Sequence, residues 1–358
     1  MSTNHNDGWY HDDHPSQEVC RLNMDPISQG TVGALAAQAS SQDRNIAKIT
    51  LVGCLAGLAP DLDVLIQSHE DPILFLEYHR QFSHSLIFIP FGSFLVALAI
   101  SPFFKGSISF KALYLASFMG YATHGLLDAC TSYGTQLFWP FSTDRVSWNN
   151  ISIVDPLLTI PILFLVLSAL KTKKKLLSFI AVGWSLLYLT LGVIQYQRAL
   201  SAAVKLADSR GHSALRITLK PSFGNLILWK AIYQNDNYYY VDAIRAGYSS
   251  YWCSGTIVEK FEYKLHTPLL DIKSQQGKDI ERFRWFSQDY LGFDTESNLI
   301  TDIRYSMLPN EVSPMWGLGV DHKKRVDEHA SWWASRELNR RQLQDFKNMI
   351  TGETCSML

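Results

Sequence analysis

The chain has 358 residues, 47% of them hydrophobic, and its formal net charge is -1. A chain with so little net charge lacks the positive field that holds a polyanion, so no nucleic-acid partner is expected. Long apolar runs are confined to residues 46–195, whereas residues 200–358 are evenly charged and rich in Tyr and Trp. This split predicts a membrane half, with the lipid bilayer as its partner, joined to a water-exposed half.

The N-terminal segment argues against a signal peptide, and the cysteines argue against a site built from cysteine pairs. Residues 1–24 carry Asp, His and Asn without an apolar run, so we interpret them as a disordered polar tail and not as a signal peptide. The five cysteines are scattered and form no CxxC pair, which argues against a disulfide framework or a cysteine-zinc site.

Five apolar stretches follow in chain order. A helix that crosses a bilayer needs about 20 predominantly apolar residues. The first stretch is short by this standard and ends at a Pro-Asp-Leu-Asp sequence, whereas the second is longer and free of charge. We therefore expect four or five membrane helices, depending on whether the first stretch spans. The stretches are residues 46–59, 86–104, 112–127, 151–170 and 176–194.

The basic residues of the short loops predict an orientation, because cytoplasmic loops carry an excess of Lys and Arg. One end of the predicted bundle is rich in lysine, and the other end receives Arg80 and Arg145, with Arg198 after the last helix. The lysine-rich end is therefore expected in the cytoplasm. Its basic residues are Arg44, Lys48, Lys105, Lys111, Lys171, Lys173, Lys174 and Lys175.

Beyond the apolar half the pattern changes to that of a soluble domain. Residues 215–220, 225–230 and 238–242 are typical of strands, with a turn at residues 235–237, and residues 329–347 have the pattern of a helix. The predicted fold is an all-α multi-pass membrane domain, residues 25–199, followed by a small α/β or mostly β soluble domain, residues 200–358.

Three ionisable clusters fall at one end of the predicted helices. Two carboxylates follow a proline, two histidines precede the second apolar stretch, and an imidazole and a carboxylate lie one turn apart on the third. Taken alone, each cluster is also explained by packed histidines or helix caps. Ionisable groups at membrane depth cost roughly 2.5–3.5 kcal/mol each, so several together need mutual compensation. We therefore expect bound divalent metal, with zinc preferred over manganese or iron. The candidate ligands are Asp61, Asp63, His79, His84, His124 and Asp128.

Three further residues are candidates for catalysis. Asp155 stands at a predicted helix start, where it could be a further ligand, a general base or a plain cap. Arg80 and Arg145 could clamp an anionic substrate such as phosphate. A simple ion pair or a lipid-headgroup contact explains either arginine equally well.

The motifs at these clusters resemble the YdjM-type family of inner-membrane metal-dependent hydrolases. The resemblance rests on Pro60–Asp63, His79–Leu86 and Gly120–Ser142, which agree in residue type and order, and it covers roughly residues 24–195. It implies a bacterial inner membrane protein in which the six residues above are the metal ligands. The family is also distantly similar to the zinc phospholipase C and P1 nuclease group, which cleaves phosphate esters.

One position departs from the family pattern. Members often have Thr-His near the N-terminus, where this chain has Ser28-Gln29. Glutamine is a poor zinc ligand, so Asp25 could substitute for that histidine.

Three functions follow from these features. The first is hydrolysis of an ester or phosphoester of a lipid or lipid-linked substrate by metal-activated water, at a site on the periplasmic face. The second is ion-coupled transport, which predicts acidic residues in mid-helix, whereas here they gather at helix ends. The third is a binding or scaffold protein with a structural metal.

Overall fold

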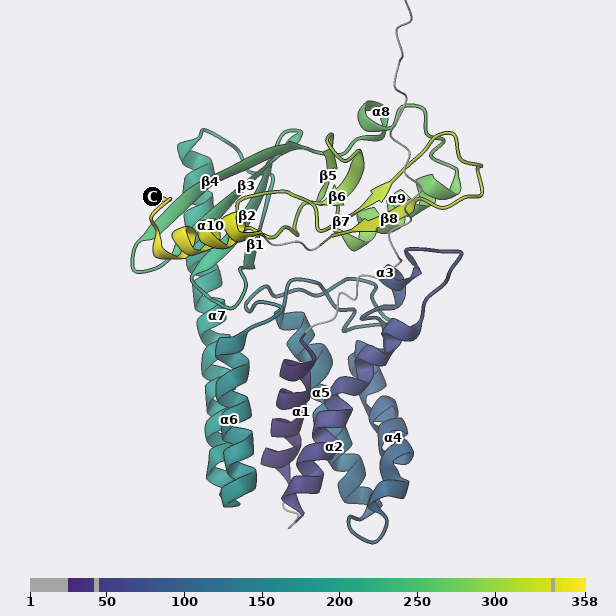
Figure 1. Cartoon of the computed structure of the whole chain (residues 1–358), viewed down its shortest axis with the longest axis vertical. Helices are drawn as coiled ribbons and strands as arrows, with labels where there is room; N and C mark the ends of the chain where they lie inside the picture. The colour runs from purple at the N-terminus through teal and green to yellow at the C-terminus, as the bar shows by residue number, and fades with distance from the viewer. Residues whose placement is uncertain (1–24, 42–44, 336–338) are drawn as a thin grey trace, which may run out of the picture.

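A helical bundle carries a β-rich layer on one of its ends (Figure 1). The computed structural model describes residues 25–41, 45–335 and 339–358, so the predicted polar tail lies outside the described residues. The helical N-terminal region and the β-rich C-terminal part agree with the predicted order of the two halves. The predicted boundary at residue 200 falls inside one long helix that belongs to both, and the division into separate domains stays a prediction.

Six longer helices form the bundle, joined by short helical turns. An unpredicted helix, α1, begins at a proline, and Asp25 caps it by accepting a hydrogen bond from the Ile27 N–H. The long helices are α1 (Pro26–Ser40), α2 (Ile46–Leu58), α4 (Ile89–Ile100), α5 (Phe110–Cys130), α6 (Pro156–Thr172) and α7 (Lys175–Ser209); the short ones are η1 (Ala59–Leu65), α3 (Leu74–Tyr78), η2 (Phe82–His84), η3 (Leu86–Phe88) and η4 (Ser101–Phe104).

Glycines let the central helices α1, α2 and α5 approach at backbone distance. A Cβ at Gly33 would lie 2.6 Å from the Gly53 carbonyl oxygen, and a Cβ at Gly120 would lie 2.3 Å from the same oxygen. Both distances are shorter than any real side-chain contact. Small residues at these positions therefore fix the spacing of the three helices, as in other closely packed membrane bundles.

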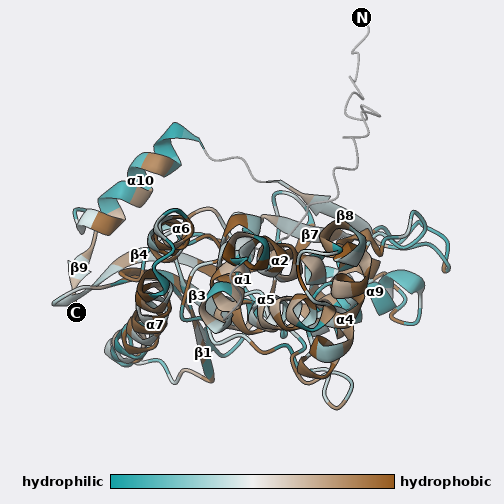
Figure 2. Cartoon of the chain, turned by 90° about the horizontal axis from the view of Figure 1, so that it is seen from below, coloured by the Kyte–Doolittle hydropathy of each residue, from teal (hydrophilic) through white to brown (hydrophobic). Residues whose placement is uncertain are grey.

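Two helical stretches of the described chain are long and apolar enough to cross a membrane, Leu86–Phe104 and Lys175–Ser209. The prediction of four or five such helices is wrong by this measure. Helices α2 and α6 have 13 and 17 residues, short of the roughly 20 that a span needs. Helix α5 has 21 residues, but its mean hydropathy is lowered by polar groups turned into the bundle. Hydrophobic residues, coloured brown, make up much of α4, α6 and α7 in the view from below (Figure 2).

Helix α7 connects the two halves. Its 35 residues extend about 52 Å, well beyond a hydrocarbon core of roughly 30 Å. The C-terminal part of α7 leaves the bundle and packs Ala203 and Leu206 against Trp229 and Ile244 of a β-sheet. The sheet therefore stands on the end of a membrane helix, as Figure 1 shows.

The C-terminal half contains two antiparallel sheets of order β1-β2-β3-β4-β9 and β5-β6-β7-β8. The strands predicted at residues 215–220 and 238–242 and the turn at residues 235–237 are confirmed. The strand predicted at residues 225–230 begins only at Leu228, because the Asn225 side chain accepts from the N–H groups of Ile227 and Leu228 in a turn before it. The strands are β1 (Arg216–Pro221), β2 (Leu228–Asn235), β3 (Tyr238–Ala246), β4 (Ser250–Glu259), β5 (Leu291–Asp294), β6 (Leu299–Asp302), β7 (Trp316–Gly319), β8 (Ser331–Ala334) and β9 (Ser356–Met357); the helices are α8 (Tyr263–His266), α9 (Gln275–Phe286) and α10 (Arg340–Thr351).

The helix predicted at residues 329–347 is wrong in its first part. Residues 331–334 form β8, because Trp332 packs inward against Phe75 and Phe283 while its neighbours in the strand face outward. The helix α10 begins only after Asn339, whose side chain and that of Gln342 form a reciprocal capping box.

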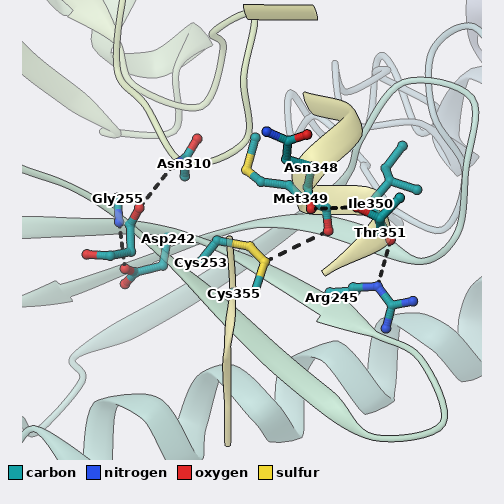
Figure 3. The surroundings of a disulfide bond; sticks show 11 residues. Asp242, Arg245, Cys253, Gly255, Asn310, Asn348, Met349, Ile350, Thr351 and Cys355 are labelled. Carbon is teal, nitrogen blue, oxygen red and sulfur yellow. Dashed lines mark hydrogen bonds between the residues drawn. A yellow bond between two sulfur atoms is a disulfide. The ribbon is translucent and has the colours of Figure 1, made fainter. Parts of the chain in front are cut away.

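A disulfide joins Cys253 of β4 to Cys355 beside β9 (Figure 3). The prediction against disulfides is therefore wrong for this pair. The two cysteines are separated by 102 residues, a spacing that no short motif reveals. The pairing of β4 with β9 places them side by side, so the disulfide fixes the C-terminus to the edge of the sheet.

Ion pairs join the β-rich half to the loops at the end of the bundle. The Arg282 guanidinium on α9 lies 2.7 Å from Asp71 and 2.5 Å from Glu77, and it also pairs with Asp279 on its own helix. This arginine therefore connects the two halves at a second place, away from α7.

Candidate metal centre

Three chain segments bring ionisable side chains to the end of the bundle that faces the β-rich half. The 3-10 helix η1 continues α2 and carries Asp61 and Asp63. The turn η2 ends at His84, directly before the apolar stretch that contains α4. The last turns of α5 carry His124 and Asp128 on one face, as the spacing of four residues predicts.

Four donor atoms from these segments converge on one point. His84 Nε2 lies 2.9 Å from His124 Nε2, 3.4 Å from Asp61 Oδ1 and 3.2 Å from Asp128 Oδ2. His124 Nε2 lies 3.3 Å from the same Asp61 oxygen and 3.7 Å from the same Asp128 oxygen. All four atoms lie within 4.8 Å of one another.

The spacing of these atoms fits the shell of a small cation. Donors about 2.1 Å from a tetrahedral ion lie roughly 3.4 Å from one another, close to the distances between the two imidazoles and the two carboxylates. The Asp61 Oδ1 and Asp128 Oδ2 atoms are buried and accept no hydrogen bond within the described part of the chain. Two imidazole nitrogens and two carboxylate oxygens therefore face a shared position.

Neighbouring groups orient both imidazoles toward that position. The His124 Nδ1–H donates to the Gly57 carbonyl oxygen at 2.5 Å, which leaves the lone pair on Nε2. Ser83 Oγ lies 2.9 Å from His84 Nδ1 and 2.7 Å from Asp63 Oδ2. Hydrogen bonds of this kind, made by the ring nitrogen that does not face the metal, hold metal-binding histidines in one tautomer.

A second group consists of Asp61, Asp63 and His79. The Nδ1 atom of His79 lies 2.8 Å from Asp63 Oδ1, and His79 Nε2 is buried without a hydrogen-bond partner in the described chain. Burial alone raises the pKa of Asp63, but the facing His84 and His79 outweigh it and hold the pKa of this carboxyl well below its usual range. Asp63 is thus a carboxylate that already has partners. It contacts the Nδ1 side of His84, opposite the nitrogen that faces the four-atom group.

The two candidate arginines have different surroundings. Arg80 is fully buried, and its Nε atom lies 3.2 Å from Asp128 Oδ2, on the edge of the four-atom group. Arg145 donates instead to the carbonyl oxygens of His79 and Gly134 and lies over the rings of Tyr133 and neighbouring aromatics. Burial lowers the pKa of Arg145 to about 10. Arg80 therefore lies beside a donor atom of the four-atom group, whereas Arg145 contacts only the backbone of the candidate ligand His79.

The third candidate, Asp155, lies outside both ligand groups. It is the N-cap of α6, accepts from the Leu158 N–H, and receives the Tyr188 hydroxyl at 2.8 Å. Of the three roles that the sequence left open, these contacts favour the helix cap. A part in catalysis stays a prediction that they do not support.

Sequence reasoning missed one residue at the site. The Gln29 side-chain amide on α1 donates to Asp128 Oδ1 at 2.8 Å, from the position where related sequences often have histidine. The glutamine in place of this histidine was the signal in the sequence that could have identified Gln29 as part of the site. Asp25 does not replace the missing histidine, because its carboxylate caps α1 and accepts from the Ser28 hydroxyl.

Comparisons with known proteins agree with these motifs. The model of the YdjM inner membrane protein family matches residues 24–199. The uncharacterized protein YfhP of Bacillus subtilis (strain 168) is 30% identical over 135 residues, which span 37% of this chain and 40% of that relative. No solved structure matches, and the similarity to zinc phospholipase C and P1 nuclease stays a prediction. The resemblance of the motifs to the YdjM inner membrane protein family is thus shown for residues 24–199.

Proposed function

We propose that this chain is a multi-pass, metal-dependent membrane hydrolase that cleaves an ester or phosphoester of a lipid or lipid-linked substrate. The observation that carries the proposal is the convergence of donor atoms from Asp61, His84, His124 and Asp128. Such a mixed nitrogen and oxygen set suits zinc best, with manganese or iron as the alternatives. The chemistry that a bound ion supplies is polarisation of the scissile oxygen and a lower pKa of the attacking water.

The side chains around the centre have separate tasks in this proposal. The Arg80 Nη2 group is buried and makes no hydrogen bond within the described residues, so it is available to bind an anionic substrate oxygen. Asp63 and Ser83 keep His84 in place. Gln29 holds the remaining oxygen of Asp128, so that the other oxygen faces the centre.

The surface next to the centre supports a lipid-like substrate. Among the four converging residues, Asp61 has the side chain with solvent access, at 11%, whereas the other three are fully buried. On the same 3-10 helix, Leu62 and Leu65 are 64% and 76% exposed, one turn apart. A substrate that reaches Asp61 therefore passes an apolar ridge at the end of the bundle, where the acyl part of a lipid fits.

Two features support a periplasmic position of the centre and the β-rich half. Disulfides persist in oxidising compartments, and the Cys253–Cys355 disulfide lies in the β-rich half. The lysine run at residues 171–175 lies between α6 and α7, at the end of the bundle away from the sheets (Figure 1). This arrangement agrees with the excess of basic residues in cytoplasmic loops.

Metal analysis combined with a hydrolysis assay tests the proposal. The purified full-length protein and its Asp61→Asn variant are assayed on phospholipid vesicles and on nitrophenyl esters and phosphoesters. Asp144→Asn serves as the matched control, because Asp144 is an exposed carboxylate in a nearby loop. We expect the wild type and the control to contain metal and to turn over at least one substrate, and Asp61→Asn to lose turnover.

Three results would contradict hydrolysis. Full turnover by Asp61→Asn on every substrate that the wild type cleaves would remove the centre from the reaction. Unfolding on metal removal, in a protein that never shows turnover, would favour a scaffold with a structural metal. Ion flux into liposomes without turnover would favour a transporter.

A further inference from the structure

A cavity of about 290 Å³ lies between the β-rich half and the loops that follow α5. One wall is formed by Ser132 and Tyr133 with residues 152–154, and the opposite wall by β1 and β2. Tyr305, which also lines the cavity, donates its hydroxyl to the Ser132 carbonyl oxygen at 2.8 Å and so connects the β-rich half to the first wall. Neither ligand group of the metal centre contributes a residue to its lining.

Two buried lysines face this cavity from neighbouring strands. Lys220 of β1 and Lys230 of β2 are direct cross-strand partners, so their side chains leave the same face of the sheet. They are only 9% and 5% exposed. Like charges at opposed positions destabilise a sheet, and burial of each charge adds a further cost. In its charged form and without a ligand, the pair therefore destabilises the fold.

Neither ammonium forms an ion pair with a carboxylate among the described residues; Asp302 and Glu311 act on them only from a greater distance. The Lys220 ammonium donates to the Arg304 carbonyl oxygen and lies over the Tyr305 ring, and the Lys230 ammonium donates to Ser306 Oγ and the Glu311 carbonyl oxygen. All of these partners are neutral. The Asp302 carboxylate, which favours the charged form of both lysines, is itself paired with the Arg304 guanidinium at 2.6 Å.

Two further hydrogen-bond donors belong to the lining of the cavity. Ser222 Oγ and Trp316 Nε1 are buried and have no hydrogen-bond partner in the described parts of the chain. Beside these donors, the cavity has apolar walls at Met307, Met315 and Phe346. Two ammonium groups beside a hydroxyl and an indole N–H match the higher negative charge and the additional acceptor oxygens of a phosphate better than the single charge of a carboxylate.

We propose that this cavity binds an organic phosphate, with the phosphate group between Lys220 and Lys230 and the apolar substituent along Met307, Met315 and Phe346. Burial and the absence of a carboxylate within ion-pair distance make the charged form of the lysines costly without a ligand, and a phosphate between them supplies the negative charge that stabilises it. The cavity is separate from the metal centre, and this proposal does not depend on hydrolysis.

Calorimetric binding to the full-length protein in detergent tests the proposal. The probes are inorganic phosphate, a short-chain phosphatidic acid and octanoate, each added with a chelator to the Asp61→Asn variant so that the metal centre is removed as a competing site. We expect phosphatidic acid to bind and octanoate to bind at least tenfold more weakly. Binding of inorganic phosphate with equal affinity would assign the site to free phosphate, and weaker binding would assign it to a lipid-type phosphate.

Variants of the two lysines connect the binding to the cavity. In the same background, Lys220→Met with Lys230→Met should lower phosphate affinity at least tenfold, whereas Lys230→Arg and the exposed control Lys278→Met should keep it within about threefold. Failure of both phosphate probes to bind the parent protein would overturn the proposal, whether or not the double variant folds. Unchanged binding in a folded double variant would do the same.

Discussion

The metal centre and the lysine cavity bury charge in opposite ways. At the centre, the carboxylates of Asp61 and Asp128 face the imidazoles of His84 and His124, and the four donor atoms meet. In the cavity, Lys220 and Lys230 meet each other across two strands with neutral oxygens as their partners. The first cluster has an excess of lone pairs, and the second has an excess of N–H donors. Neither arrangement is explained by stability alone, and each excess indicates the sign of the ligand that would complete it.

The largest expected effect is the loss of metal on removal of two converging donors. His124→Ala combined with Asp128→Ala removes half of the four-atom group. Even outer contacts to a metal site are worth about 10- to 100-fold in affinity, so the loss of two ligands should exceed 100-fold. Elemental analysis of the purified protein measures the loss.

The lysine variants supply the control for this experiment. Lys220→Met with Lys230→Met should keep wild-type metal content, because the cavity shares no lining residue with either ligand group. Metal retained by the His124→Ala, Asp128→Ala protein would show that these two residues do not hold the metal, and the contrast between a cation site and an anion site would fail.

The next effect concerns the close packing of α5 against α2, which positions the ligands of the metal centre and does not involve the cavity. Gly120→Ala on α5 would place a Cβ 2.3 Å from the Gly53 carbonyl oxygen and push α5 from α2. Such overpacking costs on the order of 1–3 kcal/mol, and it should lower both the thermal midpoint and metal affinity. Gly183→Ala on α7 is the matched control, since nothing lies within 4 Å of its Cβ position. Equal midpoints of the two variants would refute the close packing of α2 and α5.

The comparison also shows which parts of the molecule could be predicted from sequence. The metal-centre residues were found because proline, histidine and aspartate in short motifs constrain the chain locally, and His124 and Asp128 share a helix face by spacing alone. The structure brings all six predicted ligands into two groups, and their binding of metal stays a prediction. Gln29 and α1 were missed, because a helix of Gly, Ala and Ser carries almost no hydrophobic periodicity.

The cavity was not predictable, because its lysines occupy positions typical of a strand face in water. Lys220 and Lys230 are buried where segments far apart in the chain meet, and their ammonium groups donate to Arg304, Ser306 and Glu311. The disulfide between Cys253 and Cys355 depends on the same kind of distant pairing. Contacts between segments far apart in the chain therefore set the chemistry of the β-rich half, whereas local motifs set that of the bundle.

A moderate effect is expected where the two halves meet. Arg282→Gln removes ion pairs to Asp71 and Glu77 that join α9 to the bundle loops. Loss of these partly buried contacts should lower the thermal midpoint by roughly 2–5 °C and increase hydrogen exchange in α3 and α9. The exposed pair of Arg325 and Asp327 is the matched control, and Arg325→Gln should leave both measurements unchanged. Unaltered exchange in Arg282→Gln would mean that the remaining contacts between the halves, among them the hydrogen bond of Tyr305 to Ser132, hold α3 and α9 in place without these ion pairs.

The smallest effect is a pH dependence that arises in the cavity and not at the centre. Burial lowers the pKa of Lys230 to about 7, below its ordinary value of 10.5. Between these values the unfolded chain keeps a proton that the folded chain has released, so stability rises with pH across this window. Below pH 7 the folded protein carries the full cost of the buried charge. Without phosphate, Lys230→Met should therefore melt a few degrees above the wild type at pH 6.5, and the difference should shrink by pH 9.5. A difference that stays constant over this range, at a fixed scan rate, would show that Lys230 does not change its charge in the folded protein.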